Sequence, residues 1–304
     1  MKVLVTGASG YLGQHLLGTL LEDASLSVYA AYGSLETFPE DFPKATCLSI
    51  DLQAADKVKE MMATVQPDAV VHLAAVSSPA VCEKQPESSM AINKPTCLIE
   101  ALPPTATFIF LSTDQVYDGL EAPYTESSPP AKPVNMYGQS KLDFEAALAA
   151  ALPSRSVSLR SSLILGPPTP GRCRKQSFLQ FCDERMAKGE ATDFFGDETR
   201  SVLYVGDIVK IIAWLLKGGI AAGCVGVANM GGPERLTRVD VANAVAAHRG
   251  YDAAALVKSV DRKDVVPAGA VASPPDISMV SSKLLAAAGY PKTTLKEMLP
   301  LSLA

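Results

Sequence analysis

Tyr137 and Lys141 are the pair of residues whose types and spacing most directly suggest chemistry. They are four positions apart in a segment, 137–152, that is predicted to be helical, so both side chains lie on one helical face. A tyrosine ordinarily loses its proton with a pKa of about 10, and a nearby ammonium group favours the phenolate and lowers that pKa. The pair is therefore predicted to exchange a proton with a substrate oxygen near neutral pH.

A polar run follows the predicted strand Thr107–Leu111 and begins with Ser112, Thr113 and Asp114. In an open parallel sheet the carboxyl ends of the strands face the ligand crevice, so polar side chains at that end are placed for chemistry. A Y-x-x-x-K spacing alone arises often by chance on helices. It gains weight here because it follows both this strand end and a glycine-rich loop, in that order.

The glycine-rich loop lies in the first residues of the chain. Val3–Val5 are predicted to form a buried strand, and leucines at helical spacing from Leu12 predict a helix directly after the loop. Gly7 permits a sharp turn, Gly10 lets backbone approach a pyrophosphate, and Gly13 allows close packing of helix on strand. The same loop adds Ser9, Tyr11 and Leu12 to the predicted cofactor site. The alternative is a glycine-rich turn that binds nothing.

The end of the next predicted strand, Val28–Ala31, favours NADP over NAD. An enzyme that prefers NAD usually places an acid about 20 residues after the glycines, to hold the ribose hydroxyls. This chain has Tyr32, Gly33 and Ser34 there, and Ser34 either donates to a 2′-phosphate or belongs to a plain turn. NAD remains possible.

Two further strand ends complete the predicted cofactor site. Ala45–Ile50 is followed by Asp51 and Leu52, where Asp51 either accepts from an adenine amino group or caps the predicted helix Ala54–Val65. The strand Ala69–Leu73 is followed by Ala74 and Ala75, whose small side chains let a cofactor lie against the backbone. Segments 87–102 and 157–165 are predicted to be one helix and one strand.

Bulk composition excludes several classes of function. The 304 residues carry a net charge of −5, which gives no basic surface for nucleic acid. The cysteines and histidines lack metal-ligand spacing, so neither a metal site nor a disulfide framework is expected, and a reducing compartment fits best. No apolar run reaches membrane-spanning length. With a strand predicted from residue 2 there is no room for a leader peptide, so we expect a cytoplasmic protein.

Five motifs together make the chain resemble an extended short-chain dehydrogenase/reductase. More narrowly, it is similar to the dTDP-4-dehydrorhamnose reductase family, the RmlD-like group, which also includes the regulatory beta subunit of methionine adenosyltransferase. The motifs are T-G-A-S-G-Y-L-G (6–13), P-D-A-V-V-H-L-A-A (67–75), L-S-T-D-Q-V-Y-D-G (111–119), P-V-N-M-Y-G-Q-S-K-L (133–142) and D-I-S-M-V-S-S-K-L (276–284). The third and fourth motifs in combination are much more specific than any one motif.

The resemblance assigns roles to individual residues. It implies that Thr113 binds the substrate carbonyl, that Tyr137 donates the proton, and that Lys141 tunes the tyrosine and holds the nicotinamide ribose. It places Ser161 on the cofactor side of the crevice. On the substrate side it places Ser112, Asp114, Gln115, Val116 and Ser162. Gln115 stands where the family often has an aromatic residue, and Gln14-His15 where some bacterial relatives have an acid linked to a magnesium-bridged dimer.

We therefore predict an α/β protein: a Rossmann-type doubly wound parallel sheet with a smaller C-terminal α/β substrate lobe. Residues 1–165, with a returning segment 197–228, are expected to form the dinucleotide-binding domain. Residues 166–196 and 229–304 are expected to form the lobe.

The predicted function is NADP(H)-dependent reduction of a carbonyl on a sugar, most naturally a nucleotide-linked one. Two alternatives stay open. One is a cofactor-binding regulatory subunit with a protein partner. The other is an epimerase or dehydratase, which is disfavoured because 113–115 read Thr-Asp-Gln without an Asp-Glu pair. Segments 87–102 and 137–152 are where related enzymes form a homodimer.

Overall fold

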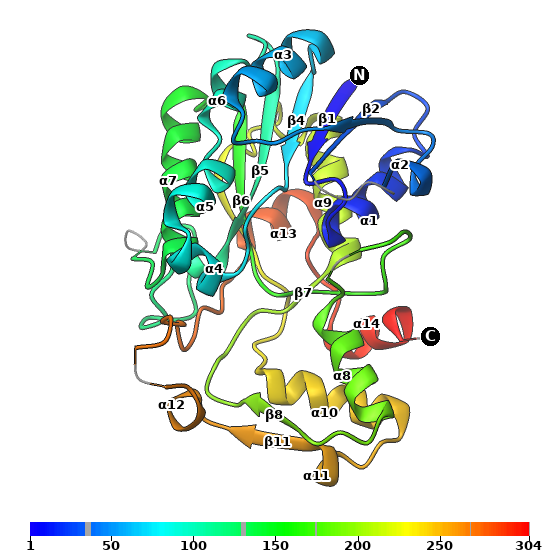
Figure 1. Cartoon of the computed structure of the whole chain (residues 1–304), viewed down its shortest axis with the longest axis vertical. Helices are drawn as coiled ribbons and strands as arrows, with labels where there is room; N and C mark the ends of the chain where they lie inside the picture. The colour runs from blue at the N-terminus through cyan, green and yellow to red at the C-terminus, as the bar shows by residue number, and fades with distance from the viewer. Residues whose placement is uncertain (34–37, 129–131, 174, 268, 304) are drawn as a thin grey trace.

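The central element is a parallel sheet of seven strands in the order β10-β6-β5-β4-β1-β2-β3 (Figure 1). The computed structural model describes residues 1–33, 38–128, 132–173, 175–267 and 269–303. The strands are β1 (Lys2–Thr6), β2 (Ser27–Tyr32), β3 (Thr46–Ser49), β4 (Ala69–His72), β5 (Thr107–Thr113), β6 (Ser156–Ser161) and β10 (Gly226–Met230). The order reverses between β1 and β4, which is the switch point where doubly wound sheets bind ligands. The predicted fold class is confirmed.

Helices cover both faces of this sheet, because its strands are apolar on both sides. On one face α1 (Tyr11–Leu20), α9 (Val205–Trp214) and the π-helix η2 (Leu215–Gly219) pack in one apolar core. On the other face α3 (Ala55–Val65), α6 (Thr96–Glu100) and α7 (Met136–Ala151) pack in a second core. Shorter segments lie at the margins: α2 (Phe38–Asp41), α4 (Pro79–Lys84), α5 (Pro86–Asn93) and η1 (Asp114–Val116).

A second, smaller lobe lies beyond the carboxyl ends of the strands, in the lower half of Figure 1. Two small parallel pairs frame it, β7 (Ile164–Leu165) with β9 (Leu203–Tyr204) and β8 (Thr192–Phe195) with β11 (Val257–Val260). Its helices are α8 (Phe178–Ala187), α10 (Arg238–Arg249), α11 (Ala253–Leu256), α12 (Arg262–Val265) and α14 (Leu295–Ser302). One further helix, α13 (Ser282–Ala288), contacts β10 and α9, on the side of the central sheet. The exact domain division stays a prediction.

Two predicted segments differ from the structure. Segment 87–102 is two helices, α5 and α6, because Pro95 lacks the backbone N–H that a continuous helix needs and stands at the N-cap of α6. Segment 157–165 is two strands, because the chain leaves the central sheet after Ser161 and β7 pairs with β9 instead.

Gly13 sets the distance between α1 and the loop that follows β1. A Cβ added at Gly13 would lie 2.4 Å from the carbonyl oxygen of Gly7 and 2.6 Å from that of Ala8. Gly13→Ala must therefore push α1 away from the loop, and we expect it to lower the free energy of unfolding by about 1–3 kcal/mol and to weaken dinucleotide binding.

Gly18 is the matched control on the same helix. No described atom lies within 4 Å of a Cβ added there, so Gly18→Ala should stabilise by about 0.5–1 kcal/mol through its higher helix propensity. Urea unfolding of both variants measures the difference. Equal effects at the two glycines would contradict this account of the packing.

Candidate active site

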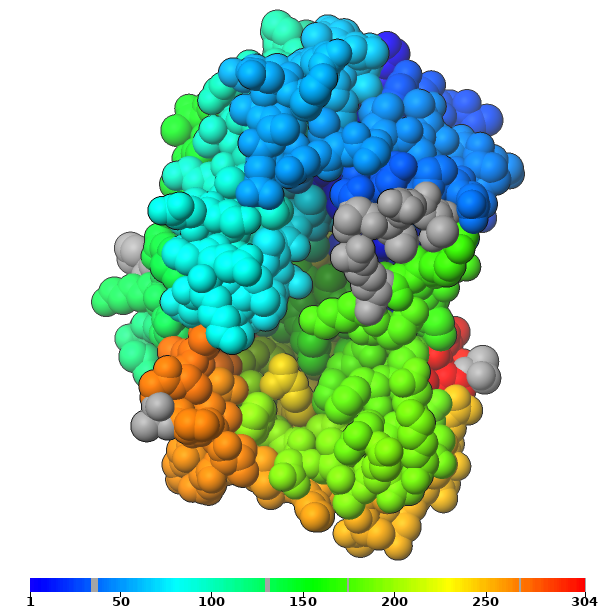
Figure 2. All heavy atoms as spheres, viewed as in Figure 1, coloured from blue at the N-terminus to red at the C-terminus, as the bar shows by residue number. Residues whose placement is uncertain are grey.

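A cleft of about 1350 Å³ separates the carboxyl ends of the strands from the second lobe. Figure 2 shows it as a hollow between the upper blue and cyan surface and the lower green and orange surface. Both halves of the molecule line it. The predicted site residues on its wall are Gly7, Ser9, Gly10, Tyr11, Leu12, Gly13, Leu73, Ala75, Ser112, Thr113, Asp114, Gln115, Tyr137, Lys141, Ser161 and Ser162.

The glycine loop forms the end of the cleft beside α1. Gly7 has φ +69°, and a Cβ there would lie 2.6 Å from the backbone nitrogen of Ala74, so the loop and the end of β4 touch backbone to backbone. Helix α1 starts after Gly10 without a side-chain cap, which leaves free N–H groups and the positive end of the helix dipole toward the cleft. This arrangement fits the pyrophosphate of a dinucleotide.

Five predicted site residues do not line the cleft, and a sixth is outside the described part of the chain. Tyr32 packs on Phe38, Leu52 and Ala74 pack in the core on the α7 face, and Val116 is fully buried beside Tyr117 and Ile277. Asp51 is exposed and accepts from the backbone of Gln53 at 3.0 Å, while the N-cap of α3 is Ala54. Ser34 lies outside the described residues.

Helix α7 delivers the tyrosine and the lysine to the cleft. Its N-cap is Asn135, whose carboxamide oxygen accepts from the N–H of Gly138 at 2.9 Å. A Cβ at Gly138 would lie 2.1 Å from the carbonyl oxygen of Gln115, so the first turn of α7 rests directly on η1. Tyr137 is thereby held beside the strand end that carries Thr113.

Lys141 is buried and donates from Nζ to the carbonyl oxygen of Leu111 at 2.9 Å. Its ammonium also lies 4.7 Å from the centre of the Phe110 ring. Burial lowers the pKa of Lys141 to about 7, and the nearby Glu145 acts in the opposite direction. A lysine in this setting changes its charge within the physiological range of pH.

The sequence-based expectation for the Tyr137 pKa is wrong for this structure. Burial raises the pKa of the Tyr137 phenol, against a smaller lowering by its hydrogen bond with Thr113. The expectation considered only the lysine four residues away, whereas the loss of water around the buried phenol is the larger influence. A tyrosine that keeps its proton is suited to donate it.

Asp114 and Ser162 form a polar pair next to Thr113. The Asp114 carboxylate is buried and accepts from the Ser162 hydroxyl at 2.8 Å and the Thr113 hydroxyl at 3.2 Å. Burial raises the pKa of Asp114, with Arg200 acting in the opposite direction. Gln115 is held by Asn135, which donates to its carboxamide oxygen at 2.9 Å.

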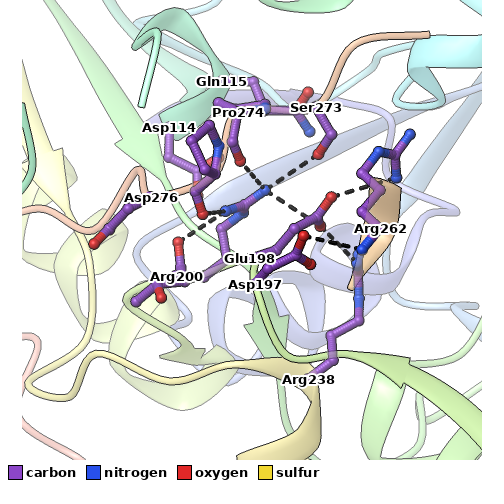
Figure 3. A network of polar contacts seen from close by, with 12 residues as sticks. Asp114, Gln115, Asp197, Glu198, Arg200, Arg238, Arg262, Ser273, Pro274 and Asp276 are labelled. Carbon is purple, nitrogen blue, oxygen red and sulfur yellow. Dashed lines mark hydrogen bonds and ion pairs between the residues drawn. The ribbon is translucent and has the colours of Figure 1, made fainter. Parts of the chain in front are cut away.

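A charged cluster on the lobe side of the cleft was not predicted. Glu198, with only 4% of its side chain exposed, accepts from Arg238 at 3.0 Å, Arg262 at 3.3 Å and Arg200 at 3.5 Å. Figure 3 shows the three guanidinium groups converging on this carboxylate. All four residues line the cleft. They come from positions 198–262 with no regular spacing, so no sequence signal marks them as one cluster.

The burial of Lys141 predicts a dependence of stability on pH. The unfolded lysine has a pKa of 10.5 and the folded one about 7, so between these values the unfolded chain binds the extra proton and stability rises with pH. Between pH 6 and pH 9 the wild type should gain about 2–3 kcal/mol that a Lys141→Met variant does not. Urea unfolding of both proteins at the two pH values measures this, and identical pH slopes would contradict it.

The fold and the cleft define a class of protein. A Rossmann-type sheet, a glycine loop at its switch point and a Thr113–Tyr137–Lys141 group opposite that loop are the features of an extended short-chain dehydrogenase/reductase. Over residues 1–304 the chain matches the model of the RmlD substrate binding domain family, and it belongs to that family.

Curated relatives include reductases and the beta subunit of methionine adenosyltransferase 2. The chain is 27% identical over 277 residues to methionine adenosyltransferase 2 subunit beta of Danio rerio, covering 90% of this chain and 80% of that protein. It is 28% identical over 268 residues to a probable low-salt glycan biosynthesis reductase of Haloferax volcanii, covering 86% and 84%. It is 32% identical over 219 residues to a probable dTDP-4,6-dihydroxy-2-methyloxan-3-one 4-ketoreductase of Streptomyces antibioticus, covering 70% and 66%.

Solved structures share the whole architecture. A hypothetical dTDP-4-dehydrorhamnose reductase of Sulfolobus tokodaii superposes with a TM-score of 0.81 at 25% identity, covering 98% of this chain and 99% of that one. UDP-glucose 4-epimerase of Thermus thermophilus, solved with NAD, gives a TM-score of 0.82 at 24% identity, covering 99% and 97%. The second likeness concerns the fold alone. No helix in the described part of this chain is long and apolar enough to cross a membrane.

Proposed function

We propose that this protein is an NADP(H)-dependent reductase of a carbonyl group on a nucleotide-linked sugar. The observation that carries the proposal is the position of Thr113, Tyr137 and Lys141 on the wall of one cleft with the glycine loop. The named reductases among its relatives support the same reading.

The residues present fit a dinucleotide. Gly7 and Gly13 let the loop pack directly on neighbouring backbone, which would lie 2.6 Å and 2.4 Å from a Cβ added at each position, and the start of α1 offers N–H groups to the pyrophosphate. In this proposal Lys141 holds the nicotinamide ribose. Preference for NADP over NAD is supported by Tyr32 and Gly33, the last described residues after β2, neither of which carries a carboxylate to repel a 2′-phosphate.

The chain's own residues handle the proton and the orientation of the substrate. A bound nicotinamide would supply the hydride for the carbonyl carbon. Tyr137 gives its phenolic proton to the carbonyl oxygen, so that the C=O group becomes CH–OH and the tyrosine is left as the phenolate. The Thr113 hydroxyl holds that oxygen in place, and the Lys141 ammonium stabilises the phenolate.

The arginines around Glu198 support an anionic, nucleotide-linked substrate. Three guanidinium groups share one buried carboxylate, so the cluster itself has more positive than negative charge. A diphosphate has the charge and the acceptor oxygens to complete it. We place the sugar between this cluster and Tyr137.

A regulatory subunit is the second candidate. Its support is the similarity to methionine adenosyltransferase 2 subunit beta over 90% of this chain. In that case a protein partner replaces the sugar as the second ligand. The epimerase or dehydratase alternative has less support, because Thr113, Asp114 and Gln115 provide one acid and no second one. For either candidate we propose the cytoplasm as location, since all six cysteines are free thiols.

The deciding experiment measures NADPH oxidation by the purified protein over a panel of nucleotide-linked 4-keto sugars, with NADH in parallel. Turnover with one sugar supports the reductase and identifies its substrate. Tight NADPH binding without turnover on any sugar instead supports the regulatory subunit, and a pull-down for the partner then follows.

A further inference from the structure

Glu145 lies one turn beyond Lys141, on the face of α7 that also carries Tyr137. It follows Lys141 by four residues, as Lys141 follows Tyr137, so the three side chains lie along one stripe of the helix. All three are buried. Lys141 reaches the carbonyl oxygen of Leu111, and Glu145 accepts from the hydroxyl of the next residue, Ser112, at 2.5 Å. The ammonium and the carboxylate therefore end at consecutive residues of β5.

Arg160, on β6, holds the Glu145 carboxylate in place. Its guanidinium donates to the two carboxylate oxygens at 3.1, 3.2 and 2.7 Å. Arg160 is itself held by the Tyr117 hydroxyl at 2.9 Å, which in turn donates to Asn229 at 2.6 Å. The carboxylate thus has no freedom to turn away from β5.

The groups that face Lys141 from other elements carry little charge. His72 on β4 stays neutral, because burial lowers its pKa well below the usual value. Cys82 on α4 also stays neutral, because burial raises the pKa of its thiol. Tyr137 keeps its proton, and Phe110 contributes only the face of its ring. Among the described groups acting on Lys141, Glu145 is the carboxylate.

We propose that Glu145 is a positioning residue: it supplies the negative charge that keeps Lys141 protonated in its buried pocket, and so keeps it able to hold the ribose and to stabilise the tyrosine phenolate. The inference deepens the proposed function, since it concerns the same tyrosine and lysine. It assigns the Glu145–Arg160 pair a part in the chemistry beyond joining α7 to β6.

The test compares Glu145→Gln with Arg160→Gln. Glu145→Gln removes the charge and keeps an acceptor oxygen, so Lys141 should lose its proton about one pH unit lower, which is about a tenfold change in its protonation equilibrium. Arg160→Gln leaves the Glu145 carboxylate in place and should not lower the pH at which Lys141 loses its proton. The matched control is Glu100→Gln, which breaks the exposed pair with Lys59.

Two readouts make the result independent of turnover. The first is NADPH affinity followed by fluorescence from pH 6 to 10, whose decline at high pH reports the loss of the Lys141 proton. The second readout needs no ligand: it is the pH at which the free energy of unfolding begins to rise. Each variant is compared with the same variant carrying Lys141→Met in addition, so that the difference reports Lys141 alone. Where Glu145→Gln does not fold, the Glu145→Gln/Arg160→Gln double variant removes both charges. It must still show a downward shift, smaller than that of Glu145→Gln because the loss of the Arg160 charge acts in the opposite direction.

The proposal is overturned if Glu145→Gln, or the double variant, titrates as the wild type does. It is equally overturned if Glu145→Gln and Arg160→Gln lower the pH of the transition by the same amount, because that result means general damage to the packing. A wild type that binds NADPH and reduces no sugar would end the reductase proposal, while the comparison of the variants would still decide the role of Glu145.

Discussion

Tyr137→Phe is expected to lower kcat for sugar reduction by about 10²–10⁴-fold, the usual contribution of a general acid. The phenol is buried and keeps its proton until the carbonyl oxygen needs it, and phenylalanine fills the same space without a proton to give. Affinity for NADPH should change by less than about twofold, because Lys141 and the glycine loop remain in place. Steady-state kinetics and fluorescence titration measure the two quantities separately.

Tyr251→Phe is the matched control for this prediction. The Tyr251 hydroxyl contacts Asp183 at 3.2 Å in the second lobe, outside the residues that line the cleft, so kcat should be unchanged. If Tyr137→Phe retained full turnover, the proton would have to come from another group, and Asp114 with its raised pKa would be the first to examine.

Glu198→Gln should lower the free energy of unfolding by about 2–3 kcal/mol. The substitution removes the carboxylate that three guanidinium groups share and leaves Asp114 and Asp276 as the acids that act on Arg200, and breaking a buried ion pair on one side costs about 3–5 kcal/mol. We expect a loss below that general range because 38% of the Arg238 side chain and 27% of the Arg262 side chain are exposed to solvent. Urea unfolding measures the change, and a nucleoside diphosphate should restore part of the lost stability.

Glu184→Gln provides the comparison, because Glu184 lines the same cleft and is exposed on α8. Its stability should stay within about 0.5 kcal/mol of the wild type. If Glu198→Gln were equally neutral, the cluster would not depend on its carboxylate. The arginines would then be held by the carbonyl groups of the 271–275 segment, to which Arg200 and Arg262 also donate.

Features that depend on nearby residues followed from the sequence alone. The strand, glycine loop and helix around Gly7, Gly10 and Gly13 form from adjacent residues, and the four-residue spacing of Tyr137 and Lys141 holds on any helix. Alternation of apolar strands and helices, together with the resemblance to a reductase family, predicted a doubly wound parallel sheet. Local patterns did not predict that the helix ends before Pro95. They also did not predict the pairing of β7 with β9, because these strands are far apart in the sequence.

Only the tertiary structure decided which distant residues share an environment. Glu198 forms ion pairs with Arg238 and Arg262 in the second lobe, and Glu145 forms an ion pair with Arg160. The spacing of these residues in the sequence predicts neither contact. The Tyr137 pKa is the clearest case. The sequence shows a lysine four residues away, but the burial that raises the pKa arises only in the folded chain. Periodicity and spacing reflect the local geometry of the backbone, whereas burial and long-range charge pairing exist only once the chain has folded.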